Sequence, residues 1–488
     1  MKKMMILLLL GSTAQVFAQK VAKPDAYAKT ITAADAKKHL YILAAPDMEG
    51  RETGTEGQRK AAAYIQNHFQ QLGLQPGSAE GYQQFYTLYQ DSLLSASVEV
   101  NGKAFEMDKD FTPGQNNIPA TLKVSEVVVI GAGAADSLNG ADLAGRAVLV
   151  VGNANMAFFT QLAKKGPAAV LTVSPNFPLQ LTRPSSRKGR AGIHAFKSTI
   201  VPQQYFISEN VARAIAGSVY DAVKSANSSV QLAKAEVLLD VKKQTLKGAA
   251  SNVVALLPGT DLKDEYVVIS AHYDHVGIVN GKLHPGADDD GSGTVGVLEI
   301  AEAFAKAKQA GKGPRRSIVF LANSGEEKGL LGSEYYSNHP LFPLDKTTVD
   351  LNIDMIGRSD PDRAKGDSTN YVYVVGDDKV SSDLKPISEG QNKKYLNMEL
   401  DYKYNDPNDK ERIYYRSDHY NFARYGVPII FYYDGMLRPD YHKPTDTPDK
   451  INYELLQKRA QLVFYTAWEM ANRNGMLQRD LPLPKPGR

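Results

Sequence analysis

The chain has 488 residues, 23% of them charged, and a formal net charge of +3, an ordinary composition for a globular enzyme. This length exceeds what one hydrophobic core usually organises, so we expect at least two domains. The near balance of charges gives no support to binding of nucleic acid or of an anionic membrane. The chain has no cysteine, which excludes disulfides and thiolate chemistry, so any metal must be held by His, Asp or Glu.

The first residues have the layout of a secretory signal peptide. Lys2 and Lys3 precede a short apolar run, and small residues follow up to Ala18. The apolar run is too short to cross a hydrocarbon core about 30 Å thick, so we expect no stable membrane insertion. Without a cysteine near the leader, lipid anchoring is also excluded. We predict cleavage near Ala18 and export to the periplasm or the medium.

After the leader, residues 33–44 and 56–72 have helical periodicity, and the polar, Gly-rich segment APDMEGRETGTEG lies between them. From about residue 98 to 242 the sequence changes to short β-rich runs such as 124–130 and 147–151. We interpret this segment as a separate inserted domain.

From residue 251 onward, apolar strands alternate with amphipathic helices. Strands are predicted at 266–271, 317–322, 349–354, 371–375 and 428–432, and helices at 291–308 and 453–472. This alternation predicts an α/β fold with a mostly parallel twisted sheet flanked by helices. The predicted divisions are a signal peptide (1–18), the first part of the main domain (19–97), the insert (98–242), the rest of the main domain (243–475) and a Pro-rich tail (476–488).

Five segments place acidic residues or histidines just after the predicted strands, where open α/β sheets hold their ligands. They are SAHYDHVG, GADDDGSGT, NSGEEKGLLGS, NIDMIGR and DYHKPTDTPDK. Two divalent ions held close together repel each other and need a shared carboxylate with further ligands on each side. Imidazole and carboxylate groups suit zinc, and a second carboxylate beside the metals can act as a general base. The adjacent residues Glu326 and Glu327 can divide these two roles.

The five segments resemble the motifs of metallopeptidase family 28, the two-zinc aminopeptidases related to glutamate carboxypeptidase and the transferrin receptor. The resemblance is strong over 251–451 and weak over 43–73. It implies two zinc ions per chain, with Asp289 bridging, and a zinc aminopeptidase fold. It also implies the following roles: His272 and Asp354 bind one zinc, Glu327 and His442 bind the other, Glu326 is the base, Asp274 orients His272, and Arg416 and Tyr441 stabilise the oxyanion.

Several of these positions have simpler alternatives. Asp288 or Asp290 could be mistaken for the bridge, although Asp290 or Ser292 is expected to cap the following helix. Arg416 could pair with Asp418, and Tyr441 could pack on the sheet edge. Other polar residues have no assigned role: His275 and His419 near the motifs, the histidines expected at the surface (His39, His68, His194, His284 and His339), and the basic loop from Arg183 to Lys197.

The insert, with SEVVVIGAGAADSLNGADLAGRAVLVV and KKGPAAVLTVS, is similar to the protease-associated domain found in many members of the same family. Such domains usually act as lids or spacers and contribute no chemistry of their own.

The expected activity is hydrolysis of the N-terminal peptide bond of peptides with a free N-terminus, with one zinc holding the amine and Glu326 transferring the proton. The alternatives are a carboxypeptidase or dipeptidase of the same family, a one-zinc glutaminyl cyclase, and a binding ectodomain without activity. A cyclase would leave His272 and Asp354 without a metal, and an inactive ectodomain requires lost ligands, which this sequence does not show. Oligomeric state, side-chain preference and physiological substrate are not predicted.

Overall fold

The computed structural model describes residues 23–114, 116–133, 138–174, 177, 193–194, 202–226 and 229–483. The predicted signal peptide, the basic loop from Arg183 to Lys197 apart from 193–194, and the end of the Pro-rich tail lie outside the described residues. Among the helices of the described part, none is both long enough and apolar enough to cross a membrane.

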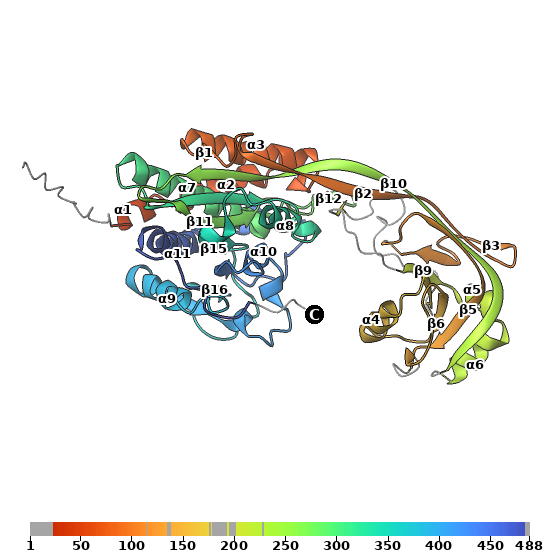
Figure 1. Cartoon of the computed structure of the whole chain (residues 1–488). Helices are drawn as coiled ribbons and strands as arrows, with labels where there is room; N and C mark the ends of the chain where they lie inside the picture. The colour runs from red at the N-terminus through yellow and green to blue at the C-terminus, as the bar shows by residue number, and fades with distance from the viewer. Residues whose placement is uncertain are drawn as a thin grey trace, which may run out of the picture. The chain divides into compact units, whose positions relative to one another are not determined.

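The contacts within the chain divide it into two compact units. The first combines Met1–Gln84 with Ser251–Arg488, and the second is Phe85–Ala250 (Figure 1). The segment predicted as an insert, 98–242, lies inside the second unit. The N-terminal helices and the C-terminal α/β segment, far apart in sequence, therefore build the same unit.

The first unit is built on a mixed sheet whose central strands are parallel. Strands β14, β11, β15 and β18 run parallel, while β10 and β16 join them antiparallel on either side. The predicted fold class, a mostly parallel sheet flanked by helices, is confirmed. In sheet order the strands are β17 (Glu399–Asp401), β16 (Tyr371–Val375), β18 (Ile429–Tyr433), β15 (Thr347–Ile353), β11 (Leu262–His272), β14 (Arg316–Asn323), β10 (Val230–Leu257) and β1 (Gln75–Pro76).

Helices cover both faces of this sheet, because successive residues of each strand point to opposite faces and both are apolar. On β11, for example, Ile269 contributes to one buried cluster and Val268 to another. The helices are α1 (Asp25–Ala28), α2 (Ala33–Leu43), α3 (Glu56–Gln71), α7 (Gly293–Gln309), α8 (Leu331–Asn338), α9 (Leu384–Tyr395), α10 (His419–Ala423) and α11 (Tyr453–Asn472).

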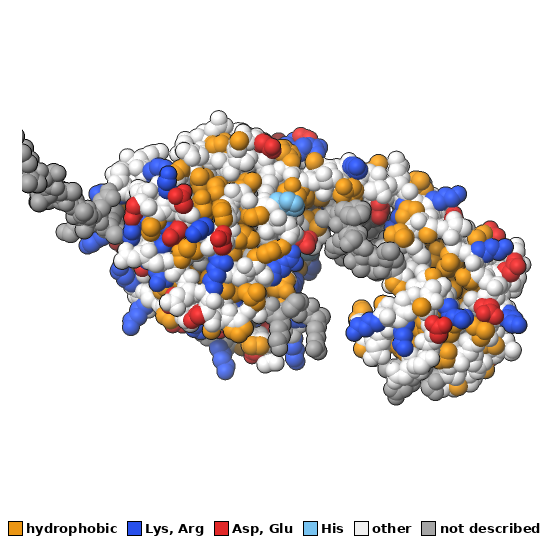
Figure 2. All heavy atoms as spheres, viewed as in Figure 1, with side chains coloured by type: hydrophobic (Ala, Val, Ile, Leu, Met, Phe, Trp, Pro, Cys, Tyr) orange, Lys and Arg blue, Asp and Glu red, His pale blue; other side chains and the backbone are white. Residues whose placement is uncertain are grey.

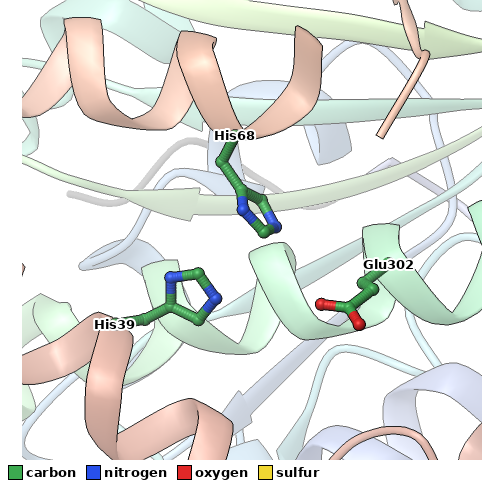
Figure 3. Close-up of side chains that lie close together, drawn as sticks. All are labelled: His39, His68 and Glu302. Carbon is green, nitrogen blue, oxygen red and sulfur yellow. The ribbon is translucent and has the colours of Figure 1, made fainter. Parts of the chain in front are cut away.

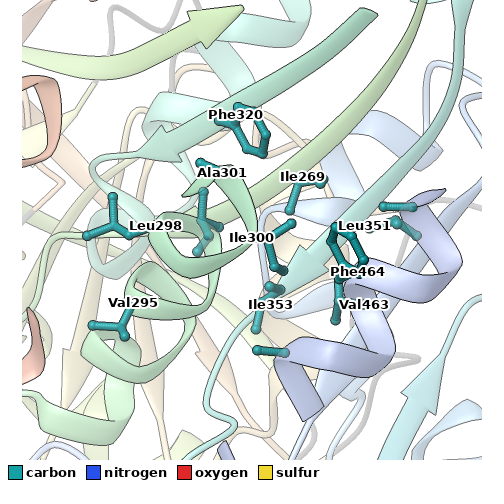
Figure 4. Packing of buried hydrophobic residues seen from close by; sticks show 14 of the residues in the cluster. Ile269, Val295, Leu298, Ile300, Ala301, Phe320, Leu351, Ile353, Val463 and Phe464 are labelled. Carbon is teal, nitrogen blue, oxygen red and sulfur yellow. The ribbon is translucent and has the colours of Figure 1, made fainter. Parts of the chain in front are cut away.

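The larger cluster lies between the sheet and α2, α3, α7 and α11. Figure 4 shows its centre, where Ile300 of α7 lies on the side of Ile269 of β11 and Phe464 of α11. These side chains are fully buried. Burying a side chain of this size stabilises the fold by about 1.5–3 kcal/mol, so the sheet edge that carries the polar motifs rests on a rigid support.

The second unit has its own apolar core and its own short parallel sheet. Strands β2 (Gln83–Val100) and β10 include residues of both units. Figure 2 shows that acidic and basic side chains are mixed over the visible face of each unit. The other elements are β3 (Lys103–Phe105), β4 (Phe111–Pro113), β5 (Ala120–Gly131), β6 (Ala147–Val151), β7 (Ala169–Val173), β8 (Ile193–His194), β9 (Gln203–Ile207), α4 (Met156–Lys164), α5 (Glu209–Ala216) and α6 (Ser218–Ala226).

Candidate metal centre

The polar motifs meet at one edge of the parallel strands. His272 is the last residue of β11, and Asp354 directly follows β15. Strand β14 ends at Asn323, and the short helix that contains Glu326 and Glu327 begins three residues later. Because these three strands are parallel neighbours, their carboxyl ends bring the side chains together, as the motif positions predict.

The first group of side chains surrounds Nε2 of His272. This nitrogen lies 3.3 Å from Oδ1 of Asp289, 3.5 Å from Oδ1 of Asp354 and 3.8 Å from Oε2 of Glu326. Burial lowers the pKa of His272, but the charges of Asp354 and Glu326 outweigh burial and raise this pKa well above its ordinary value. The imidazole therefore lies in a strongly negative environment.

The second group surrounds Glu327, at the opposite oxygen of Asp289. Nε2 of His442 lies 2.9 Å from Oε2 of Glu327 and 3.0 Å from Oδ2 of Asp289. The two carboxylate oxygens of Asp289 thus face different histidines, His272 on one side and His442 on the other. This is the arrangement that a bridging carboxylate requires.

The three neighbouring aspartates differ in what their carboxylates contact. Oδ1 of Asp288 accepts a hydrogen bond from the backbone N–H of Gly357 at 2.8 Å. Oδ1 of Asp290 accepts the backbone N–H of Gly293 at 2.8 Å and caps the start of α7, as expected for one of the two capping candidates. Asp288 and Asp290 therefore hold the backbone, and Asp289 faces the histidines.

Asp274 lies beside His272 and beside the loop that carries Glu326. Nδ1 of His272 lies 3.1 Å from the backbone oxygen of Asp274, and its distance to the carboxylate is longer, 3.7 Å. The carboxylate accepts hydrogen bonds from the hydroxyl of Thr53 at 2.6 Å and from the backbone N–H of Glu326 at 3.2 Å. Asp274 therefore links the β11 edge to the loop that carries Glu326.

His275 is a part of the site to which the sequence analysis gave no role. It is fully buried, and its Nδ1 lies 2.9 Å from Oε1 of Glu327 and 3.7 Å from Oδ2 of Asp289. Its ring also meets that of His442 edge-on, with ring centres 5.6 Å apart. The position of His275 three residues after His272, in the motif HYDH, was the available signal. His419 is buried under the sheet edge, where Nε2 pairs with the backbone oxygen of Tyr414 at 2.8 Å.

Arg51 lies inside the segment that the sequence analysis treated as a polar loop, yet its side chain is fully buried. Its guanidinium donates to the backbone oxygens of Tyr273 at 2.7 Å, Leu43 at 2.8 Å, and Pro285 and Gly286, both at 2.7 Å. The last two are separated from the aspartate run only by Ala287. Arg51 therefore ties the N-terminal helices to two of the segments that carry the metal-site residues.

Replacing Arg51 by alanine is expected to lower the free energy of unfolding by about 3–5 kcal/mol, because four buried backbone oxygens lose a charged donor. Arg59→Ala is the matched control. Arg59 pairs with Glu56 on the exposed face of α3, and such a pair contributes about 0–1 kcal/mol. Urea denaturation of the two variants measures the difference; equal midpoints would contradict the structural role of Arg51.

A pocket opens over the first group. Asp289, Glu326 and Asp354 line it, and so do five largely apolar residues: Met355, Ile413, Phe431, Tyr433 and Leu437. Arg416 and Tyr441 also line it, and the guanidinium of Arg416 donates to the hydroxyl of Tyr441 at 3.4 Å. Arg416 thus contacts Tyr441, and both side chains face the space above the carboxylates.

Burial and neighbouring charges act against each other throughout this cluster. Burial lowers the pKa of His442, but the close carboxylates of Asp289 and Glu327 outweigh burial and raise this pKa to about 10. The pKa of Glu326 is raised well above its ordinary value by burial and by the charges of Glu327 and Asp354. The negative charge of the carboxylates therefore exceeds the positive charge that the histidines can supply. An excess of negative charge is the electrostatic character of a cation site.

The donor atoms also fit metal ligation. Oδ2 of Asp289, Oε1 of Glu327 and Nε2 of His442 are buried and make no hydrogen bond within the described part of the chain. Zinc binds such atoms at about 2.0–2.2 Å, which places neighbouring donors about 3.3–3.6 Å apart. The separations between proposed ligand atoms around His272 and His442, 2.9–3.5 Å, lie close to this range.

Comparison with known proteins agrees with this geometry. Residues 252–467, which contain the whole cluster, match peptidase family M28. The probable leucine aminopeptidase of Arthroderma otae is 30% identical over 278 residues, covering 56% of this chain and 70% of the relative. The chain belongs to peptidase family M28. The family resemblance expected from the motifs is thus confirmed, and with it the expectation of a peptide hydrolase.

Another curated relative and two solved structures are also similar to this chain. Aminopeptidase YwaD of Bacillus subtilis is 26% identical over 260 residues, covering 49% of this chain and 50% of its own. The aminopeptidase from Aneurinibacillus sp. strain AM-1 has a TM-score of 0.59 at 20% identity, covering 96% of this chain and all of its own. The zinc aminopeptidase BSAP from Bacillus subtilis has a TM-score of 0.53 at 20% identity, covering 91% and 96% of the two chains. At these identities the two structures establish the fold of this M28 chain.

Proposed function

We propose that this M28 peptidase is an exported two-zinc aminopeptidase. The observation that carries the proposal is the position of Asp289, whose two carboxylate oxygens face His272 and His442 from opposite sides. The names of the relatives, leucine aminopeptidase and zinc aminopeptidase, support the same activity. Export rests on the leader sequence alone, and the resemblance of 98–242 to a protease-associated domain remains a prediction.

The proposed ligands follow the two groups of side chains. His272 and Asp354 hold one ion, Glu327 and His442 hold the other, and Asp289 bridges. Glu326 is kept for proton transfer, since its carboxylate lines the pocket and lies 3.8 Å from Nε2 of His272, farther than the carboxylates of Asp289 and Asp354. His275 is proposed to position Glu327, because its ring nitrogen lies 2.9 Å from the Glu327 oxygen that faces away from His442.

The side chains above the cluster suit the hydrolysis of a peptide bond. When bound, the zinc pair supplies Lewis-acid polarisation of the scissile carbonyl and favours ionisation of the attacking water. Glu326 takes a proton from that water as the carbon–oxygen bond forms, and gives it to the leaving nitrogen as the carbon–nitrogen bond breaks. Arg416 and Tyr441 line the same pocket and can donate hydrogen bonds to the developing oxyanion.

The apolar lining also supports a preference at the N-terminal residue. Met355, Ile413 and Leu437 can enclose an aliphatic side chain. The pocket therefore favours peptides that begin with an apolar residue such as leucine.

A pair of chromogenic substrates tests the proposal. Leucine p-nitroanilide should be hydrolysed, whereas its N-acetyl derivative should have a kcat/KM more than about tenfold lower, because blocking the amine removes the group that is recognised. C-terminal amidation of a leucine peptide should have little effect. Equal rates for free and acetylated substrates would contradict aminopeptidase action.

The same assay separates the alternatives. A strict requirement for a free C-terminal carboxylate would favour a carboxypeptidase or dipeptidase. Cyclisation of N-terminal glutamine without peptide hydrolysis, together with one zinc ion per chain, would favour a glutaminyl cyclase. A chain that holds zinc but has neither activity would favour a binding ectodomain.

A further inference from the structure

A second group of possible metal ligands lies among the helices of the first unit, and none of its members belongs to the centre described above. His39, His68 and Glu302 offer ligand atoms that all lie within 4.8 Å of one another. Figure 3 shows the three side chains turned toward a common space from three different helices. His39 and His68, which were expected at the surface, are half-buried, because the helices that carry them pack on α7. His284 is also buried, and His339 is exposed as expected.

The helices hold these side chains in fixed positions. His39 lies near the end of α2, His68 near the end of α3, and Glu302 in the middle of α7. Glu299 lies one turn before Glu302 on α7, so both carboxylates are on the same side of that helix. Because α2, α3 and α7 contribute to one apolar core, the group rests on a common rigid support.

Both imidazoles are suited to metal binding. Burial lowers the pKa of His39 to about 4 and also lowers the pKa of His68, so both rings are neutral near pH 7 and keep a free lone pair. Nδ1 of His39 pairs with the hydroxyl of Tyr64 at 2.7 Å, which fixes the ring and leaves Nε2 for a ligand. Such a hydrogen bond to the second ring nitrogen is usual for metal-binding histidines.

Two buried polar atoms of this group lack partners. Nε2 of His68 and Oε1 of Glu299 make no hydrogen bond with any described residue. The Glu299 side chain is 1% exposed, and this oxygen lies 3.8 Å from Nε2 of His39. Burial raises the pKa of Glu299 to about 8, because no nearby cation compensates its charge strongly enough. A divalent cation between these atoms would supply both the missing partner and the missing charge.

We propose that His39, His68 and Glu302 form a second, weaker binding site for zinc or a similar transition metal, with Glu299 as the neighbouring carboxylate. Two imidazoles and a carboxylate are a zinc-type donor set, whereas calcium and magnesium prefer oxygen ligands alone. Modest side-chain rotations would bring the donors to the spacing that zinc requires. The bound ion would clamp α2 and α3 onto α7, the helix that begins after the aspartate run.

Lys306 gives the proposal a distinctive test. Its ammonium group pairs with Glu302 and competes with a metal for that carboxylate. Removing Lys306 should therefore tighten zinc binding, whereas removing His68 should abolish it. A cluster that serves only for packing would not respond to these two changes in opposite directions.

The experiment uses the full mature chain with Asp289→Ala, which empties the proposed two-zinc centre and leaves the helix site visible. Equilibrated with free zinc, this variant should hold about one ion per chain, and its Tm should rise as zinc is added. Adding His68→Ala should remove both the bound ion and the rise in Tm. Adding Lys306→Ala should lower the zinc concentration for half-saturation several-fold. Adding the exposed His339→Ala should change neither the bound ion nor the rise in Tm.

If the variant with His68→Ala still holds the ion, the proposed site is wrong. The proposal is also wrong if Lys306→Ala leaves the zinc concentration for half-saturation unchanged. Circular dichroism without zinc checks that each variant is folded. If His68→Ala does not fold, Glu302→Gln, which keeps the size of the side chain, gives the same test. The outcome is independent of aminopeptidase activity, because zinc content and Tm are read without a substrate.

Discussion

Glu326→Gln is expected to lower kcat by about 10²-fold or more while the zinc content of the proposed centre stays unchanged. Glutamine keeps the shape and hydrogen bonding of the side chain but cannot accept the proton of the attacking water. The fold should be unaffected, because Glu326 lines the pocket and does not fill the apolar core. Steady-state kinetics combined with elemental analysis of washed protein measures both quantities.

Glu327→Gln is the matched control, one residue away and chemically the same change. Oε2 of Glu327 lies 2.9 Å from Nε2 of His442, so this carboxylate is proposed as a ligand. The Glu327→Gln variant should therefore lose metal, and added zinc should partly restore its rate of hydrolysis. If Glu326→Gln loses zinc while Glu327→Gln keeps it, the two roles are reversed; full activity in both variants would place catalysis elsewhere.

Much of the first unit could be predicted from the sequence because its strands and helices are long and strongly patterned. The prediction of a helix at 453–472 matches α11 at both ends, and the predicted strand at 371–375 matches β16. Several candidate site residues could be located because they lie at or just after the end of an apolar strand: His272 ends β11, Asp354 follows β15, and Glu326 and Glu327 come soon after β14. Parallel pairing then brings these strand ends together, which requires no information beyond the strand order.

The remaining features depend on tertiary contacts that leave no periodic signal. The segment around Arg51 is polar and Gly-rich, which is typical of a solvated loop, but the Arg51 guanidinium finds four backbone oxygens in the folded chain. His39 and His68 occupy helix positions that would be exposed on isolated helices. Both side chains become half-buried because α2 and α3 pack on α7. The sequence pattern of one helix does not show which other helix it packs on.

Asp289→Ala is expected to remove both ions of the proposed centre, so that zinc content falls by about two per chain and activity is lost. Two divalent ions about 4 Å apart repel by about 4 kcal/mol even in the dielectric of water, and a bridging carboxylate offsets that repulsion. Asp289 also supplies a ligand to each side, because its two oxygens face His272 and His442 separately. Neither remaining pair of ligands is then expected to retain its ion in washed protein.

The control is the exposed aspartate Asp362, whose replacement by alanine should leave zinc and activity unchanged. Asp289→Asn adds a second comparison, since it keeps the shape of the side chain and removes its charge. If the Asp289→Asn variant also loses about two zinc ions, the negative charge of Asp289 is what holds the two ions together. Loss of a single ion in both variants would show that the two positions bind independently and that Asp289 is a ligand to one of them only. That result would support the one-zinc alternative. The Asp289 carboxylate would then face His272 and His442 because it forms hydrogen bonds with their rings.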